Sequence, residues 1–432
     1  MNMNKILLFT LLIFITRISE AQLKWRVVGI MPYPVSGGAV VYDIAAQSNK
    51  IYIFGGYSDS LQSAVDWIQE YDAEKNSWRI VGHMIQPRDQ FVADIWKNSI
   101  MYFGGTSDGS TDKSAIESWD YKIVTNLASV FDRNKNFSRL FSTGQIVNDN
   151  FYIIGGDPSN PNDTLSYIAA YNLNTRQNGF SFRSPSPDPP RQRMTFIVDD
   201  NIYIFGGVTN GVMRSIQKFN ITSQKLDNLT EQLNEARAAG AAVYNPISKK
   251  GFVIGGYNET FNSMNTVEQV EILPDGLLNI TQLQTAPLNY ARASLMAVSY
   301  KNGYVAVFGG RTDRGHLGKV VPYIEILVEA SSVQNDNETP TGFTLYQNYP
   351  NPFNPSTKIS FQIAKRSNVS LDVYSVLGQH IVKLVSGEFE PGKYTSEWNA
   401  LDKLNNKVPS GIYFLQLRAD NLIQTKKMVL LK

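Results

Sequence analysis

Arginine recurs at an equivalent position before several Gly-Gly pairs of this chain. It is the residue type at that position best suited to binding chemistry. Five arginines each stand 15 to 18 residues before a Gly-Gly pair, and a sixth lies beside one of them; the six are Arg88, Arg139, Arg191, Arg193, Arg237 and Arg292. A guanidinium donates paired hydrogen bonds to carboxylate or hydroxyl oxygens. The stretches after the Gly-Gly pairs are rich in Ser, Asn and Asp. Together these residues indicate a site for an acidic or hydroxyl-rich ligand.

The repetition also has a structural interpretation. A residue that returns in every unit is what a scaffold needs to join its units. This is the favoured hypothesis for the four arginines Arg88, Arg139, Arg237 and Arg292. The doubled pair in the sequence PRQR, Arg191 and Arg193, favours ligand binding instead. If the pair forms a site, Arg193→Ala should leave folding intact and weaken the ligand.

Other kinds of chemistry find little support in the sequence. The chain has no cysteine, which excludes thiol nucleophiles, disulfides and zinc–thiolate sites. Its three histidines, His83, His316 and His380, are not accompanied by a Gly-x-Ser-x-Gly motif. The Asn- and Asp-containing stretch 157–164 lacks the spacing and the closing Glu of an EF-hand. We therefore expect no catalytic residue, no metal and no cofactor.

The elements that must position the arginines are short strands. Apolar runs end at Gly-Gly pairs spaced 49, 51, 51, 49 and 54 residues apart, and these glycines are Gly55, Gly56, Gly104, Gly105, Gly155, Gly156, Gly206, Gly207, Gly255, Gly256, Gly309 and Gly310. A period near fifty with several strands predicts a six-bladed β-propeller. Unbroken apolarity predicts that each run is buried on both faces. In an up-and-down blade, the arginines would share a rim with the polar loops after the glycines.

The first repeat also carries Tyr71 and Trp78, seven residues apart. With the Gly-Gly pair before them, they resemble the kelch repeat, and the resemblance covers residues 22–328. Trp119 and Phe219 hold the Tyr place in blades two and four, and neither has the following Trp. The resemblance implies that large aromatic side chains lie where blades stack on each other. Copper-radical oxidases with kelch-like propellers need a Cys–Tyr cross-link, which this chain cannot form.

The two ends of the repeated region complement each other. After Gly310 the last repeat has room for only one more strand, so its outermost strand is missing. At the other end, residues 25–34 (WRVVGIMPYP) echo residues 78–87 (WRIVGHMIQP). A strand over residues 23–29 would complete the last blade and remove an exposed sheet edge. The sequence thus predicts a ring that its own N-terminal strand closes.

Residues 1–21 are expected to be a signal peptide. Lys5 precedes an apolar stretch of ten residues, interrupted by Thr10, and Ala21 is the last residue before the expected cleavage site. A stretch of ten residues is too short for a spanning helix, which needs about 20. The charges nearly cancel, at 40 Lys and Arg against 38 Asp and Glu, which argues against nucleic acid as a partner. We expect no membrane span in the mature protein.

Beyond an expected linker over residues 329–342, the sequence changes character. In residues 343–432, apolar and polar residues alternate as they do in the strands of a small Ig-like β-sandwich. They resemble the C-terminal sorting domain of the type IX secretion system through Asn348, Pro350, Asn351, Pro352, Phe353, Asn354, Gly378, Gly411, Lys427 and Lys432. The resemblance implies that this domain takes the protein across the outer membrane, with the type IX translocon as its partner.

These patterns indicate an exported kelch propeller, secreted or attached to the cell surface. Its loop rim is expected to bind an extracellular glycan or protein. The alternative is a carbohydrate-active enzyme similar to the sialic-acid mutarotase, which is also an exported six-bladed kelch propeller. That alternative rests on fold class alone, and fold does not determine function.

Overall fold

The computed structural model describes residues 23–43, 49–105, 114–122, 126–158, 166–183, 190–301, 303–313, 318–329, 343–404 and 406–431. The expected signal peptide with its cleavage after Ala21, His316, most of the expected linker and Lys432 lie outside these residues. So does most of the Asn- and Asp-containing stretch 157–164.

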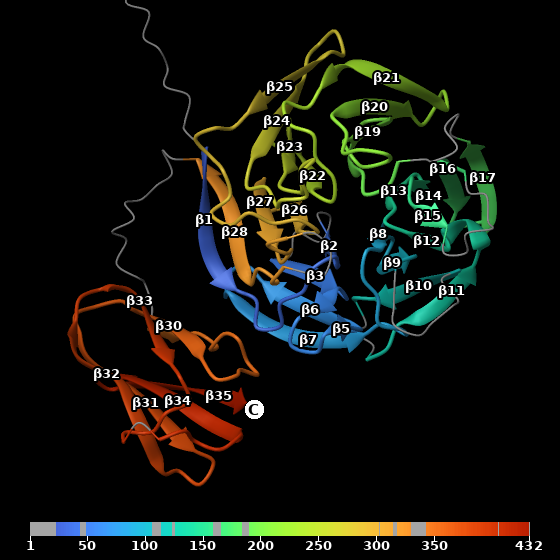
Figure 1. Ribbon diagram of the computed structural model, residues 1–432. Helices are drawn as coiled ribbons and strands as arrows, with labels where there is room; N and C mark the ends of the chain where they lie inside the picture. Colours follow the sequence, from blue (N-terminus) through green and yellow to red (C-terminus); the bar gives the residue numbers. More distant parts are fainter. Residues whose placement is uncertain are drawn as a thin grey trace, which may run out of the picture.

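The first three quarters of the chain form a ring of antiparallel sheets around one axis (Figure 1). Within the described residues, six four-stranded sheets follow one another round the ring. The innermost strands are β2 (Ala39–Tyr42), β8 (Val92–Trp96), β13 (Thr143–Val147), β18 (Met194–Val198), β22 (Ala241–Asn245) and β26 (Met296–Tyr300). The predicted all-β propeller is confirmed.

The other three strands of each sheet follow in order from the axis to the outside of the ring (Figure 1). The second strands are β3 (Lys50–Phe54), β9 (Ser99–Phe103), β14 (Asn150–Ile154), β19 (Asn201–Phe205), β23 (Lys250–Ile254) and β27 (Tyr304–Phe308). The third strands are β6 (Trp67–Asp72), β10 (Ala115–Asp120), β16 (Ile168–Asn172), β20 (Ser215–Asn220), β24 (Val267–Ile272) and β28 (Tyr323–Glu329). The outermost strands are β7 (Ser77–His83), β11 (Ser129–Arg133), β17 (Gln177–Phe182), β21 (Lys225–Gln232), β25 (Leu278–Gln282) and β1 (Leu23–Ile30).

The second strands are the buried layer of the ring. In each of them the last four residues before the Gly-Gly pair are buried, so the prediction of burial on both faces is confirmed. The kelch aromatics pack across the seams between blades. Tyr71 and Trp78 of blade one lie 5.7 and 6.1 Å from Phe308 of blade six, measured between ring centroids. Trp119 of blade two packs in the same way on Phe54 of blade one, at 5.8 Å.

The outer edge of blade six comes from the N-terminal end of the propeller. β1 pairs antiparallel with β28, from Leu23 opposite Glu329 to Ile30 opposite Tyr323, with a bulge between Val27 and Gly29. The side chain of Trp25 is buried between blades five and six. Because the first and last strands of the ring share one sheet, the ring has no open seam.

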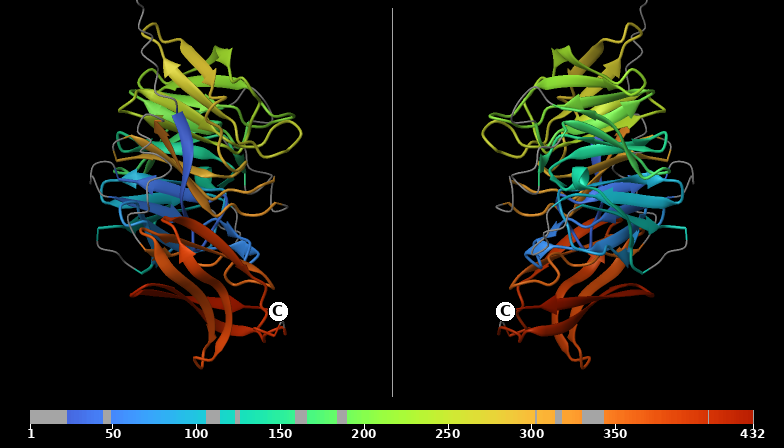
Figure 2. Two further views of the ribbon diagram at one scale, coloured as in Figure 1. Left: turned by 90° about the vertical axis from the view of Figure 1, so that its left-hand side faces the viewer. Right: turned by 90° about the vertical axis from the view of Figure 1, so that its right-hand side faces the viewer.

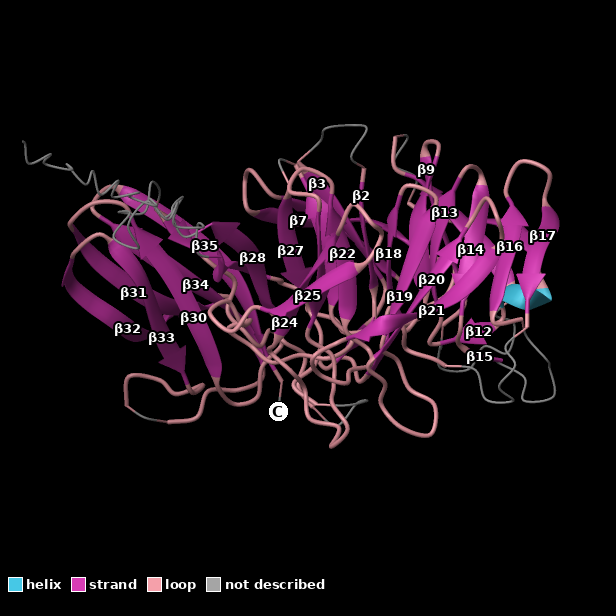
Figure 3. Ribbon diagram, turned by 90° about the horizontal axis from the view of Figure 1, so that it is seen from above, coloured by secondary structure: helices cyan, strands magenta, loops and turns pink. Residues whose placement is uncertain are grey.

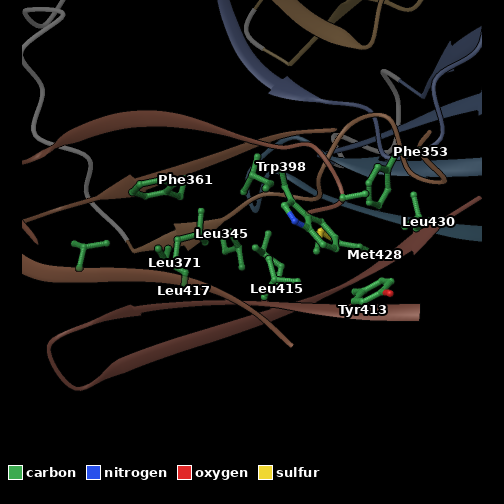
Figure 4. Packing of buried hydrophobic residues seen from close by; sticks show 14 of the residues in the cluster. Leu345, Phe353, Phe361, Leu371, Trp398, Tyr413, Leu415, Leu417, Met428 and Leu430 are labelled. Atoms are coloured by element: carbon green, nitrogen blue, oxygen red, sulfur yellow. The ribbon is translucent and has the colours of Figure 1, made fainter. Parts of the chain in front are cut away.

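A smaller module follows the ring and consists of two sheets packed face to face. One sheet contains β29 (Thr344–Leu345), β30 (Thr357–Ile363) and β33 (Gly392–Trp398). The other contains β31 (Ser367–Ser375), β32 (His380–Phe389), β34 (Gly411–Ala419) and β35 (Leu422–Leu430). Figure 4 shows the core between them, where Trp398 packs on Phe353 and Tyr413 at centroid distances of 5.4 and 5.1 Å.

The module lies beside blades six and one of the ring (Figures 1 and 2). The hydroxyl of Tyr349 donates a hydrogen bond to the carbonyl of Val320, at 3.3 Å. Figure 3 shows that strands account for nearly all regular structure, with a single 3-10 turn, η1 (Lys135–Phe137), in the part of the chain that is described.

Candidate functional site

Four of the six arginines singled out in the sequence lie inside the blades. The side chains of Arg88, Arg139, Arg237 and Arg292 are fully buried. In each of them Nη1 donates to the carbonyl of the first glycine of the Gly-Gly pair in the same blade, at 2.8, 3.0, 3.0 and 2.9 Å. Each of these guanidinium groups therefore bonds within its own blade and is shielded from solvent.

The backbone of the same four residues joins neighbouring blades. Their carbonyls accept hydrogen bonds from the N–H groups of Gly56, Gly105, Gly207 and Gly256, each the second glycine of the preceding blade. In blade one, Val35 holds the arginine place, and its carbonyl accepts from the N–H of Gly310 at 3.3 Å. One residue thus links two blades, through its side chain to its own glycine pair and through its carbonyl to the previous pair.

Three of the buried arginines meet a glutamate on the third strand of their blade. Glu117 is bonded to Arg88, Glu268 accepts from Arg237 at 2.9 Å, and Glu325 accepts from Arg292 at 2.5 Å. These acids are fully buried, and the sequence analysis missed them. In blades two and six, the signal in the sequence was an acid directly after the two apolar residues that begin the third strand, as in AIESW and YIEIL.

Burial and pairing with an acid shift the pKa of these arginines in opposite directions. Burial lowers the pKa of Arg237 and of Arg292, and the neighbouring glutamates oppose that shift. In blade three, where Ala169 holds the acid place opposite Ile153, burial lowers the pKa of Arg139 to about 10. The acids therefore offset part of the effect of burial on the buried guanidinium groups.

One residue per blade lies two positions after the arginine place and has a positive φ of 50° to 65°; these are Gly37, Gln90, Phe141, Gln192, Ala239 and Ser294. They form what we call the collar. Backbone N–H groups of the collar donate to the carbonyl of the preceding member, as from Gly37 to Ser294 at 2.8 Å and from Gln90 to Gly37 at 2.6 Å. Three further bonds of this kind join Gln192 to Phe141, Ala239 to Gln192 and Ser294 to Ala239. These bonds connect residues of all six blades around the axis of the ring.

Blade four departs from the pattern by one residue. Because Gln192 is its collar member, Pro190 holds the arginine place, and Arg191 stands one position later. Arg191 is partly exposed, and its Nη1 lies 3.3 Å from Oδ1 of Asp157. Of the six predicted arginines, it is the one whose side chain reaches the loop face.

Arg193 turns back into the blade. Its side chain is buried, Nη2 donates to the carbonyl of Ile204 at 3.1 Å, and burial lowers its pKa. Its aliphatic stem lies on Gly207, where a Cβ would come within 2.5 Å of Cδ of Arg193. The expectation that Arg193→Ala leaves folding intact does not fit this environment, because the change would open a void against Gly207. Arg191 replaces it as the residue to test.

A cavity of about 780 Å³ opens on the loop face above the collar. Its floor includes the collar members Gln90, Phe141, Gln192 and Ser294. Its wall combines Arg191, Thr209 and Asn210 with the aromatic pair Tyr257 and Phe261, whose ring centroids are 5.7 Å apart. Asp89 and Glu259 add carboxylates. This size and this mixture of polar and aromatic groups suit a ligand of several hundred daltons.

The remaining candidates lie away from this cavity. His83 pairs with Asp66 at 3.2 Å on the outer strand of blade one, and His380 pairs with Asp372 at 2.8 Å in the C-terminal module. No group of three or more His, Asp or Glu side chains with metal-binding geometry occurs among the described residues. The aromatic pair was not singled out from the sequence, although Tyr257 follows its Gly-Gly pair directly.

Two protein-family models match the chain. The KLHDC2/KLHL20/DRC7 Kelch-repeats domain matches residues 9–207, and the Secretion system C-terminal sorting domain matches residues 347–431. The chain carries a kelch-repeat propeller and a secretion sorting domain. Because that sorting domain belongs to type IX secretion, the protein is exported, to the medium or to the cell surface.

Curated relatives match the kelch part. The chain is 23% identical over 237 residues to Kelch-like protein 26 of Danio rerio, covering 52% of this chain and 37% of the relative. It is 25% identical over 264 residues to Kelch domain-containing protein 10 of Bos taurus and of Homo sapiens, covering 53% of this chain and 57% of each relative. The chain thus spans only about half, or less, of the length of these relatives.

The residues that carry the sorting-domain resemblance join the two ends of that domain. Oδ1 of Asn351 accepts from the N–H of Val429 at 2.7 Å, and Nδ2 of Asn351 donates to the carbonyl of Lys427 at 3.2 Å. Phe353 lies in the core of the domain (Figure 4). Nδ2 of Asn348 donates to Oγ1 of Thr357 at 2.9 Å. The described residues include no helix long and apolar enough to cross a bilayer.

Proposed function

We propose that this exported kelch propeller binds a hydroxyl-rich ligand, in first place a glycan, in the cavity above the collar. The observation that carries the proposal is the composition of the cavity wall. Arg191, Asn210 and Thr209 offer several hydrogen-bonding groups, and the exposed face of Phe261 offers an apolar surface on which a sugar ring can stack. Hydroxyl-rich ligands need both kinds of contact at once.

Rigidity of the site supports the proposal. The collar beneath the cavity is held by backbone hydrogen bonds, and the contact between Arg191 and Asp157 restricts the guanidinium. A wall that is already ordered loses little conformational entropy on binding. Position also supports it, since the cavity gathers residues of all six blades, which a single loop could not supply.

A glycan-array screen with the full chain tests the proposal, followed by affinity measurements on variants. We expect Arg191→Ala and Phe261→Ala each to weaken the best glycan by about tenfold or more, as for residues central to a binding site. Tyr304→Ala is the matched control. Tyr304 is 42% exposed, Phe261 is 41% exposed, and Tyr304 stands at the start of β27, at the opposite end from the glycine pair.

The outcomes separate cleanly. Unchanged affinity in the Arg191 and Phe261 variants, or an equal loss with Tyr304→Ala, would remove the cavity from consideration. If no glycan on the array binds the intact chain, the glycan proposal itself fails.

A further inference from the structure

The turn between β31 and β32 of the sorting domain presents two large aliphatic side chains to solvent. Val376 is 62% exposed and Leu377 is 92% exposed. Neither side chain belongs to the core of the sandwich, which is complete without them. Tight turns are normally occupied by Asn, Asp, Gly, Ser or Pro, because those residues satisfy the turn backbone or tolerate its φ angles. The fold does not explain Val-Leu at this tip.

The tip is rigid. The N–H of Gly378 donates to the carbonyl of Ser375 at 3.0 Å, and the N–H of Ser375 donates to the carbonyl of Gln379 at 2.9 Å. Oγ of Ser375 accepts from the N–H of Gln379 at 3.2 Å. Gly378 has a φ of 79°, which closes the turn. The two side chains are therefore held out on an ordered support, and an ordered contact residue loses little entropy on binding.

Further aliphatic side chains gather at the same end of the domain. Leu404, 72% exposed, stands on a loop that is tied to β32 by a hydrogen bond from the N–H of Lys403 to the carbonyl of Ile381, at 3.0 Å. Ile412 is also exposed, and the pairing of Ser375 with Tyr413 places it beside the tip. We call Val376, Leu377, Leu404 and Ile412 the apolar tip.

We propose that the apolar tip is the surface by which the sorting domain docks on the type IX secretion machinery. The tip lies within residues 347–431, which match the sorting-domain model, and such a domain engages that machinery. Lys403 and Lys407 are exposed on the loop of Leu404, where the carboxylate of Asp402 is occupied by the N–H groups of Leu404 and Asn406. The domain as a whole is basic, with 11 Lys and Arg against 6 Asp and Glu in residues 343–432. The partner surface is therefore an apolar pocket bordered by acidic side chains.

The test uses the full chain expressed in a bacterium that has a type IX secretion system. In the variant Val376→Ser/Leu377→Ser, we expect the fraction that reaches the medium or the cell surface to fall about tenfold or more, since two anchors leave the interface. The protein should accumulate in the periplasm instead. The melting temperature of the purified chain should stay unchanged, because both side chains are exposed.

The matched control is Leu422→Ser/Ile423→Ser. These residues are 49% and 53% exposed, and they begin β35 at the opposite end of the same sandwich, next to the turn after β34. We expect this variant to be secreted like the unaltered chain. Normal secretion of the tip variant, or an equal loss in both variants, would overturn the proposal.

A second variant covers the case in which the double change lowers the melting temperature. Leu377→Ala alters only the side chain that is 92% exposed and cannot disturb the core. Reduced secretion of this variant, at an unchanged melting temperature, supports docking through the tip, and normal secretion contradicts it.

Discussion

Asp59 and Arg311 join the first blade to the last on the loop face of the propeller. Oδ1 of Asp59 accepts a hydrogen bond from Nη2 of Arg311 at 2.7 Å, although 252 residues separate them in the chain. Oδ2 of Asp59 accepts from the N–H of Val320 at 2.7 Å, and Arg311 also donates to Oγ of Ser36 at 3.2 Å. The pair therefore fastens the ring at the place where the chain itself does not connect the blades.

Asp59→Ala should weaken this fastening. The buried guanidinium of Arg311 would lose its pairing with Asp59, and we expect the free energy of unfolding to fall by about 2 kcal/mol. Urea denaturation of the full chain measures the change. Glu388→Ala removes an acid from a pair with Arg366 in which both side chains are exposed, and it should change stability by less than about 0.5 kcal/mol. Equal effects of the two changes would contradict the fastening role.

The buried pair of Arg237 and Glu268 should behave as a unit. Glu268 also accepts hydrogen bonds from the N–H of Asn234 at 2.7 Å and from that of Glu235 at 3.2 Å. Either single change, Arg237→Met or Glu268→Leu, should cost about 3–5 kcal/mol because it removes the buried counter-charge of the other residue, although the carboxylate of Glu235 still lies 3.3 Å from Arg237. The double change should cost clearly less than the sum. A double-mutant cycle measured by denaturation decides this, and additive losses would show that the two side chains are not coupled.

The strand β1 should be essential for the closed ring. Trp25→Ala empties a buried site between blades five and six, and we expect it to cost about 3–5 kcal/mol. Arg26→Ala, next along the same strand with its side chain exposed, is the control and should have little effect. Deletion of residues 23–30 should cost more than Trp25→Ala or abolish soluble expression. An unchanged melting temperature after the deletion would show that the ring does not depend on β1.

Because of Asp94, the propeller should be more stable in mild acid than at neutral pH. Burial raises the pKa of Asp94 to about 6, despite hydrogen bonds from the N–H groups of Ile146 and Ile95 at 2.7 Å each. The folded state therefore binds a proton at this carboxyl more tightly than the unfolded state, whose pKa is close to the ordinary value of 3.8. Its contribution to stability is present below pH 3.8 and is lost as the pH rises through about 6.

Asp94→Asn tests this, because an amide keeps an acceptor for Ile146 and has no proton to lose. We expect the variant to melt higher than the unaltered chain near pH 7 and to lack the fall in melting temperature between pH 4 and 6 that Asp94 causes. Differential scanning calorimetry across this range provides the measurement. If the melting temperatures of the two proteins change with pH in the same way, Asp94 is ionised as readily in the folded state as in the unfolded one.

Much of the architecture was decided by local pattern. Six glycine pairs at a period near fifty predicted the number of blades, and unbroken apolar runs before them predicted the buried second strands, as in β3 and β19. Such features can be deduced from sequence because backbone conformation and strand burial depend on residues only a few positions apart. The same holds for the sorting domain, whose landmarks are contiguous motifs.

Only the tertiary structure decided which arginine side chains are buried and which one reaches the cavity. Arg88 and Arg191 look alike in sequence, yet the first is sealed against Glu117, 29 residues away, and the second reaches the cavity because Pro190 shifts blade four by one position. The collar likewise requires six segments spread over more than 250 residues to meet at one axis. Whether a side chain is buried depends on which distant segments pack around it, and no local pattern contains that information.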